Sequence, residues 1–431
     1  EREFYDAVNS GNLLFSDSFP YKENQYMQFY LIDCQSGLMN LLIFEDNTVM
    51  LFDCNVTNTN EQEILSFLKY KIPKKFKAET NEYVQEIDVF VNSHRDLDHL
   101  RGLKKINEKF KIRSIWDSGQ SGENTDNADY NYYMYLRRKL KEENPSNLFV
   151  PVPSNIKIKS IGNADIYCLA AEEDFRENYV NGLRAQTKVQ HTNSMVLLIN
   201  YAGRKILLTG DSDWKSWKEK IKLINYENTD ILVASHHGSR SFFTDEANEH
   251  IDEDANPETT YLESIKLINP VVTLISCGNY EEYHHPNKEA MKLYKKWTSN
   301  EQVYTTKKLG TICAIINSSG SFTVVPNRFY TNDNKRNHQG FEIRGGKLEN
   351  GELKTINSGD EINVKSSLKF SIYSWGDILN NSDNIFIYWE VSNGGILKDF
   401  EHQEIYYKSE NEKIEKYKFE RELSYVGTHL L

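Results

Sequence analysis

His94-Arg95-Asp96-Leu97-Asp98-His99 is the stretch that decides the fold, because it places four metal-binding side chains within six residues. Residues 87–93 come directly before it and are mostly apolar, which predicts a buried strand that runs into the stretch. Alternate side chains of an extended segment face the same side, so His94 and Asp96 can hold one metal ion. Asp98 and His99 follow where the chain turns into a helix and can reach a second ion. The alternative is a polar loop with scattered His and Asp.

Two later strand ends carry matching side chains. An apolar run ends at Gly210-Asp211, where a carboxylate can bridge two cations. Another apolar run ends at His236-His237-Gly238-Ser239. One of these histidines can complete a metal shell and the other can contact a substrate phosphate. We take His237 as the ligand and His236 as the contact.

Two more histidine positions leave alternatives open. His191 precedes an apolar run at residues 195–199 and is either a further metal ligand or a capped loop histidine. His284-His285-Pro286 stands where Pro favours a helix start. His285 is either a residue for substrate contact and proton transfer or a structural residue at that helix start.

The order of the predicted elements indicates an α/β fold. Apolar runs predict strands at residues 27–33, 40–45, 49–53, 195–199, 205–209, 230–235 and 271–276, and helical spacing predicts helices at 61–70, 100–106 and 287–297. A helix containing Trp is also expected just after Asp211. Strands alternate with helices and the polar motifs fall at strand ends. This pattern is typical of an α/β layered protein with its site at those ends.

Two segments differ from this pattern. Residues 117–155 contain a Tyr- and Lys/Arg-rich helix at about 130–141 and are interpreted as an insertion beside the site. The composition changes after Pro326, and residues 331–337 form a polar linker. Short β-like runs with Gly, Asn and Asp turns follow. We therefore predict a hydrolase-type domain at residues 1–326 and a small β-sandwich-like domain at 327–431.

The bulk composition excludes several classes. Of 431 residues, 39% are hydrophobic and 26% charged, which is a globular composition. The net charge of −12 argues against a protein that coats DNA, although bound cations and local Lys or Arg can still hold a phosphate. The five cysteines form no CxxC pair, which favours a reducing, cytoplasmic location. No membrane contact is expected, because no apolar run approaches the roughly 20 residues of a spanning helix. There is no signal-peptide pattern and no initiator Met, so the natural N-terminus is expected upstream.

The motifs as a set resemble one protein family. The order His-x-Asp-x-Asp-His, Thr-Gly-Asp, His-His-Gly-Ser and His-Pro resembles the ComEC-type branch of the metallo-β-lactamase superfamily over residues 27–325. Asp33-Cys34-Gln35-Ser36-Gly37 resembles the opening turn of that branch, and Leu51-Phe52-Asp53 its Leu-Ile-Asp strand end. The resemblance implies an αββα sandwich with a binuclear metal site. The chain departs from the branch at His191-Thr192-Asn193-Ser194, where the branch commonly has Asn-Asn/Asp-x-Ser.

The resemblance implies phosphodiester hydrolysis, because the branch includes competence-associated nucleases and phosphodiesterase-like hydrolases. Two divalent ions would activate water and stabilise charge on the phosphoryl oxygens, and Zn²⁺ is expected with Mn²⁺ as the alternative. The metal ligands are His94, Asp96, Asp98, His99, His191, Asp211 and His237, and the catalytic residues are Asp98, His236 and His285. Lys104, Lys105, Arg137 and Arg138 are either phosphate contacts or a solvated helix face.

The C-terminal region resembles a second family. Residues 389–395 and 422–429 resemble the AGS-C sensor domain, which accompanies nucleotide-signalling anti-phage systems. This implies a role in antiviral defence and a cyclic-nucleotide ligand; the alternative is a sandwich that braces the catalytic domain or docks a protein. Nucleic acid or a nucleotide is the expected substrate, and the chain is expected to associate with itself or with a defence-system partner.

Two other functions compete with phosphodiester hydrolysis. One is hydrolysis of another ester, such as a lactone, a thioester or a phosphorylcholine ester, because a fold alone does not fix a substrate. The other is a nucleotide-binding signalling module whose metal site is vestigial. Metal content and turnover would separate that module from the two enzymes.

Overall fold

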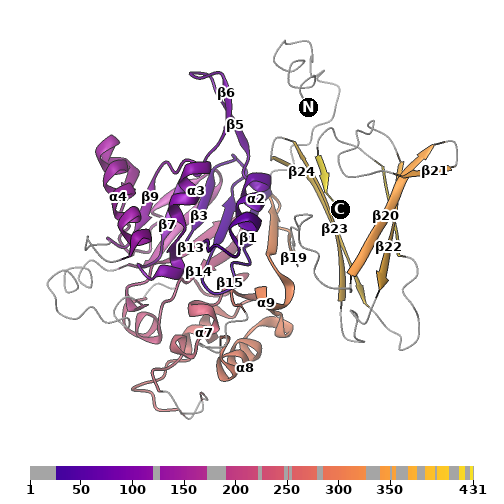
Figure 1. The fold of residues 1–431 in the computed structure, drawn as a ribbon. Helices are drawn as coiled ribbons and strands as arrows, with labels where there is room; N and C mark the ends of the chain where they lie inside the picture. Colours follow the sequence, from indigo (N-terminus) through magenta and orange to yellow (C-terminus); the bar gives the residue numbers. More distant parts are fainter. Residues whose placement is uncertain are drawn as a thin grey trace.

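The computed structural model describes residues 26–119, 127–171, 191–221, 226–246, 251, 255–278 and 285–326, and seven strands between residues 340 and 430 (Figure 1). Helices and strands alternate through the first part of these residues, which confirms the predicted mixed α/β class. None of the described helices is long and apolar enough to cross a membrane.

The first sheet has eight strands in the order β10-β9-β7-β3-β2-β1-β18-β19. The bounds are β1 Tyr26–Leu31, β2 Asn40–Ile43, β3 Val49–Phe52, β7 Val89–Asn92, β9 Ile115–Asp117, β10 Leu148–Phe149, β18 Ile312–Asn317 and β19 Phe322–Pro326. β3, β7, β9 and β10 run parallel to one another, whereas β1, β2, β18 and β19 pair antiparallel. The strand that leads into the His-x-Asp-x-Asp-His stretch, β7, therefore lies inside the parallel half.

The second sheet has seven strands in the order β11-β12-β13-β14-β15-β16-β17. The bounds are β11 Lys159–Ile161, β12 Ala164–Ala170, β13 Val196–Tyr201, β14 Arg204–Leu208, β15 Ile231–Val233, β16 Val272–Ile275 and β17 Val303–Thr305. β14 to β17 are parallel, and β13 runs antiparallel to β14. The end of β14 and the start of β13 therefore lie at the same edge, which places Asp211 and His191 near each other.

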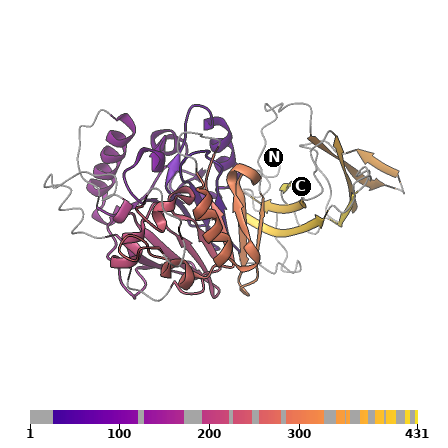
Figure 2. The same cartoon turned by 90° about the horizontal axis from the view of Figure 1, so that it is seen from below.

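Helices cover both sheets. The first group is α2 Glu61–Lys71, α3 Leu103–Lys109 and α4 Ala128–Glu143, and the second is α7 Glu263–Ile268, α8 Lys288–Trp297 and the short α9 Thr306–Leu309. Short turns are η1 Leu97–His99, η2 Pro145–Asn147, η3 Ser216–Lys220, η4 Ser235–Gly238, η5 Arg240–Phe242 and η6 Ser299–Glu301. Figures 1 and 2 show α2, α3 and α4 on one side of the sheets and α7 and α8 on the other.

Alternation along the strands builds the core. Successive side chains of a strand point to opposite faces, so one strand serves two layers. In β13, Leu197 and Ile199 pack toward the first sheet, whereas Val196 and Leu198 join the cluster that includes the helix residues Ile265 and Leu293. Each such buried side chain contributes about 1.5–3 kcal/mol relative to exposure. The strand ends that carry the polar motifs are therefore held by packing on both faces.

Several predicted elements need correction. The helix expected at residues 100–106 begins only at Leu103, because Leu100 and Arg101 form a short strand, β8, beside β4 Cys54–Asn55. Gly102 has φ of +76° and abuts Val56, so it turns the chain between β8 and α3. The predicted helix containing Trp is present but short, because residues 214–220 are helical and the last five of them form the π-helical turn η3. The supposed insertion supplies the edge strand β10, so part of it belongs to the first sheet.

The remaining strands form smaller sheets. β5 Lys74–Lys77 and β6 Glu82–Gln85 make a hairpin that the sequence did not predict. After residue 326 the described strands form one sheet in the order β21-β20-β22-β25 and another in the order β24-β23-β26. Their bounds are β20 Gly340–Glu349, β21 Glu352–Thr355, β22 Ser367–Trp375, β23 Asn384–Asn393, β24 Ile396–Tyr406, β25 Tyr417–Glu422 and β26 Thr428–Leu430. The predicted linker at 331–337 lies outside the described residues.

Candidate metal centre

The two large sheets are joined at the edge where the polar motifs lie. Met195 N donates to Ser93 O at 2.9 Å between the two sheets, and within the second sheet His236 N donates to Gly210 O at 3.1 Å. Gly210 has φ of +52°, and a side chain there would collide with Ser93 and Ser194. Glycine at this position therefore lets the strand ends approach one another. Ligand sites of α/β proteins form at such carboxyl ends of strands.

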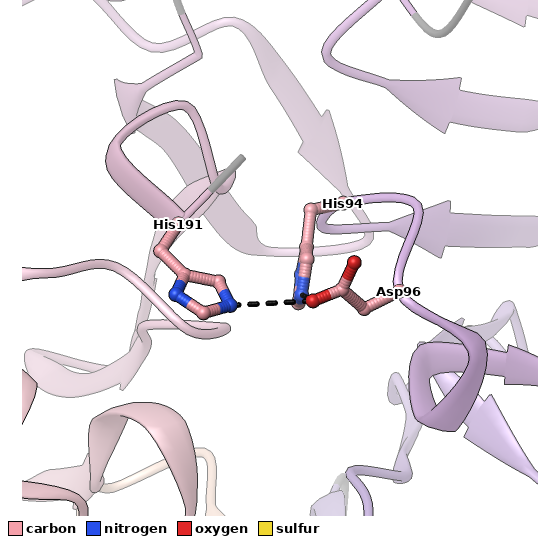
Figure 3. Close-up of side chains that lie close together, drawn as sticks. All are labelled: His94, Asp96 and His191. Atoms are coloured by element: carbon pink, nitrogen blue, oxygen red, sulfur yellow. Dashed lines mark hydrogen bonds and ion pairs between the residues drawn. The ribbon is translucent and has the colours of Figure 1, made fainter. Parts of the chain in front are cut away.

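The first cluster consists of His94, Asp96 and His191 (Figure 3). His191 Nε2 lies 3.2 Å from Asp96 Oδ2, and His94 Nε2 lies 3.5 Å from the same oxygen. One ligand-type atom from each side chain falls within 4.8 Å of the others. The sequence left His191 open between a ligand and a loop residue, and the structure brings it to the other two side chains.

The second cluster consists of Asp98, His99 and His237. His237 Nε2 lies 3.3 Å from Asp98 Oδ2, and His99 Nε2 lies 3.9 Å from that oxygen. Of the two adjacent histidines of η4, His237 is the one in this cluster, as we expected for the ligand. His236 groups instead with His191 and Asp211.

Asp211 lies between the two clusters. Its Oδ1 is 3.2 Å from His99 Nε2 and 3.8 Å from His237 Nε2, both in the second cluster. Its Oδ2 is 3.8 Å from His94 Nε2, in the first cluster, and 3.6 Å from His236 Nε2. One carboxylate therefore presents a different oxygen to each cluster. This is the arrangement expected of a bridging ligand.

Buried polar atoms test whether this site fits metal ions. His94 Nε2, His99 Nε2, His237 Nε2 and Asp211 Oδ1 are buried and have no hydrogen-bond partner among the described residues. A buried donor or acceptor without a partner costs about 1–3 kcal/mol, so four of them in one place need an explanation. Imidazole and carboxylate groups that converge in this way are suitable ligands for divalent transition metals. The donor set therefore fits divalent ions of this kind.

Asp53 supports the second cluster from behind, although the sequence reasoning gave it no role. It is fully buried, and its Oδ2 lies 2.8 Å from His99 Nδ1 and accepts from Ser93 Oγ at 2.6 Å. A carboxylate on the far nitrogen of a histidine fixes the ring so that Nε2 faces the site. The signals in the sequence were an Asp at the end of an apolar strand and the resemblance of Leu51-Phe52-Asp53 to a motif of the ComEC-type branch, neither of which assigned Asp53 a role.

The carboxylates and histidines of the site stabilise each other's charged forms. Burial alone would lower the pKa of His99, but Asp211, Asp53 and Asp98 outweigh it and hold that pKa well above its ordinary value. Burial would raise the pKa of Asp211, but His99, His236 and His237 keep it well below its ordinary value. The site without metal therefore binds protons on nitrogen atoms that metal ions would otherwise use.

His236 differs from the other histidines of the site. Burial lowers its pKa to about 3 in spite of Asp211. A neutral imidazole can hydrogen-bond a phosphate but cannot give up a proton as an imidazolium ion. His236 and His237 have φ of 49° and 55°, a region that residues other than glycine rarely adopt. Such local strain is a frequent feature of functional sites.

His285 lies beside this pair, with its ring centroid 5.6 Å from that of His236 and 6.1 Å from that of His237. Its position fits either substrate contact or proton transfer. His284, the first residue of its motif, lies outside the described residues.

Comparison with known proteins adds one sequence relative. No family model matches the chain. ComE operon protein 3 of Bacillus subtilis is 21% identical over 249 residues, which cover 57% of this chain and 27% of that protein. The chain thus matches about a quarter of the length of this relative.

Solved structures give partial likenesses. Igni18, a metallo hydrolase from Ignicoccus hospitalis, matches with a TM-score of 0.32 and 10% identity, over 70% of this chain and all of that one. A variant of the β-hydroxylase CmlA matches with a TM-score of 0.34 and 12% identity, over 73% of this chain and 59% of that one. The rubredoxin oxygen:oxidoreductase of Desulfovibrio gigas has a TM-score of 0.24 and 18% identity, over 43% and 39% of the two chains.

Proposed function

We propose that the chain is a binuclear metal-dependent hydrolase of the metallo-β-lactamase superfamily that cleaves phosphodiesters. The observation that carries this proposal is the Asp211 carboxylate, which presents one oxygen to each of two His/Asp clusters. The two sheets with helices on their outer faces fit the αββα sandwich of that superfamily. The sequence match to ComE operon protein 3 fits the ComEC-like branch.

Each residue of the site has a defined task in this proposal. His94, Asp96 and His191 would hold one ion, Asp98, His99 and His237 the other, and Asp211 both. The bound ions would supply an activated water and positive charge for the phosphoryl oxygens. His236, neutral and part-exposed, would hydrogen-bond a phosphate oxygen. His285 would protonate the leaving oxygen, because the burial that keeps His236 neutral removes it as the acid.

The site opens on the side of its carboxylates. The side chains of Asp96 and Asp98 are 29% and 36% exposed to solvent. His94, His99 and Asp211 are buried. A substrate would therefore approach over these two aspartates. Arg95 comes directly before Asp96 in sequence, and its guanidinium lies over the Tyr130 ring of α4, with 5.9 Å to the centroid. We propose Arg95 as a phosphate contact.

The basic residues named from the sequence are mostly engaged elsewhere. Arg137 Nε donates to Asp117 Oδ2 at 2.6 Å, and Lys105 Nζ lies 2.5 Å from Glu61 Oε2. Lys104 Nζ lies 3.9 Å from Glu108 Oε1. The pairs of Lys104 and Lys105 favour the helix-face interpretation, whereas Arg137, whose side chain is only 16% exposed, is bound to the buried Asp117 and fits neither alternative.

A substrate panel tests the proposed reaction. With Zn²⁺ or Mn²⁺, the purified chain is expected to hydrolyse linear DNA, RNA or cyclic oligonucleotides in preference to p-nitrophenyl carboxylic esters, because paired cations favour an anionic phosphoryl group. Product formation on each substrate is measured with Asp211→Asn as the blank. Hydrolysis of carboxylic esters alone would instead support the lactone or thioester alternative. Bound metal without any turnover would support the signalling module.

We also propose that the C-terminal strands bind a cyclic nucleotide and place the enzyme in anti-phage signalling. The two segments that resemble the AGS-C domain meet in one sheet, where Val391 of β23 pairs with His429 of β26. A turn rich in Asn and Gly beside a Trp is suited to stack a base and approach a phosphate.

Full-length Asp211→Asn protein is expected to bind a cyclic di- or trinucleotide at micromolar concentration, as measured by calorimetry. The further change Trp389→Ala should weaken binding by about 1–3 kcal/mol if its ring stacks on a base. Trp375→Ala, in the other sheet, is the matched control. If no cyclic nucleotide gives heat, the domain is a scaffold or a protein-docking surface.

A further inference from the structure

We infer that Asp213 is a positioning residue for His191 and acts through Thr192. The inference rests on the proposed binuclear site and names what holds its least buried histidine ligand in place. Asp213 follows Asp211 by two residues, yet it belongs to neither cluster of the described residues. Its side chain is buried and accepts a hydrogen bond from Thr192, the residue that follows His191.

The contacts of Asp213 tie Thr192 to the start of η3. Asp213 Oδ2 accepts a hydrogen bond from Thr192 Oγ1 at 2.7 Å, and Asp213 Oδ1 accepts from Ser216 N at 3.0 Å. Ser216 Oγ in turn donates to the carbonyl oxygen of Thr192 at 2.6 Å. Thr192 is therefore held through both its side chain and its backbone, by two residues that are themselves bonded to each other.

A second anchor lies two residues further along the chain, at Ser194. Ser194 N donates to His191 O at 3.1 Å, and Ser194 Oγ accepts from Asp211 N at 3.0 Å. The segment just after His191 is thus fixed at two points, by Asp213 through Thr192 and by Asp211 through Ser194. With these anchors His191 Nε2 lies 3.2 Å from Asp96 Oδ2.

The consequence concerns the first cluster alone. Among the described residues His191 and Thr192 lie in a short helical stretch before β13, and the His191 side chain keeps 15% exposure, whereas His94 follows β7 and its ring is buried. Loss of the Thr192 hydroxyl would remove one of the two anchors after His191 and let its ring leave the cluster. Mutation of a residue that orients a metal ligand without touching the metal commonly weakens metal binding by about 10–100-fold. The hydrogen bonds described above join Thr192 and Ser216 to Asp213 and to each other, and none of them involves Asp98, His99 or His237.

Thr192→Val tests the inference, because it removes the hydroxyl at nearly constant volume. Apo-protein is titrated with Zn²⁺ by calorimetry, and bound metal is measured by elemental analysis. Wild type is expected to bind about two ions. Thr192→Val should bind one of them about 10–100-fold more weakly and the other unchanged, as should His191→Ala. Thr192→Ser, which keeps the hydroxyl, should restore binding.

Two further variants separate positioning from general destabilisation. Thr273→Val removes another buried hydroxyl, bonded to Thr298 Oγ1, in a strand that supplies none of the clustered side chains. It should keep both ions at wild-type affinity. Asp213→Asn should reproduce the loss if Thr192→Val fails to fold by circular dichroism.

Unchanged binding of both ions by folded Thr192→Val and Asp213→Asn would overturn the inference and leave the proposed function standing. Wild-type protein that binds less than one ion would overturn both.

Discussion

Asp211→Asn is expected to lower turnover by about 10³-fold or more and to abolish stable binding of metal. A neutral amide has a single oxygen, so it cannot present one to His99 and another to His94 as Asp211 does. The change also removes the negative charge that the buried histidines face. Transition-state stabilisation by paired ions is worth several kcal/mol, and about 1.4 kcal/mol corresponds to a tenfold change in rate. Turnover and metal content of the purified variant are the measurements.

The matched control for this variant is Asp230→Asn. Asp230 is also buried and also borders a strand that carries site residues, but it lies before β15 whereas the histidines follow that strand. It accepts hydrogen bonds from Arg204 Nη1 and Lys205 N at 2.9 and 2.8 Å. Loss of stability with both ions retained is expected there. Asp211→Asn protein that keeps two ions and turns over within a few fold of wild type would show that Asp211 is not the bridge.

The side chains that cluster in the candidate metal centre could be grouped from the sequence because they follow apolar strands. In β7, β14 and β15 the apolar run marks the strand, and the polar residues just after it are forced to the sheet edge. Parallel neighbours then bring these edges together, so Asp211 and His237 could be grouped before any coordinates. The choice of His237 over His236 agrees with the distances to Asp98.

The supporting residues could not be predicted in the same way. Asp53 and Asp213 are single buried carboxylates whose partners lie 46 and 21 positions away in the chain. Such partners depend on the packing of two sheets against each other, and no spacing within one strand encodes that. The β5–β6 hairpin was also missed, because Lys74–Lys77 and Glu82–Gln85 are largely polar and lack the apolar face that identifies a strand.

Removal of metal is expected to abolish hydrolysis. It should also lower the melting temperature by about 5 °C or more relative to protein saturated with Zn²⁺. A ligand that binds only the folded state stabilises it by about 4 kcal/mol when the free ligand concentration is 1,000 times the Kd. Each kcal/mol of added stability raises the melting temperature of a large domain by about 2–4 °C. Activity should return with Zn²⁺ or Mn²⁺. Chelated protein whose metal loss has been verified, yet which still hydrolyses substrate at the original rate, would contradict a metal-dependent reaction.

The size of this temperature difference should depend on pH with a definite sign. Without metal, nearby carboxylates outweigh burial and raise the pKa of His99, His191 and His237, so these groups bind protons more tightly in the folded state. Their contribution to stability is complete below the unfolded pKa of about 6.5 and is lost as pH rises through the folded pKa. The apo-protein should therefore melt at lower temperature at pH 8 than at pH 6.

Zinc competes with these same protons and binds more tightly as pH rises. The gap between the metal-loaded and apo melting temperatures should consequently widen from pH 6 to pH 8 in differential scanning fluorimetry. If the difference between the two melting temperatures narrows from pH 6 to pH 8, metal does not displace protons from the clustered histidines.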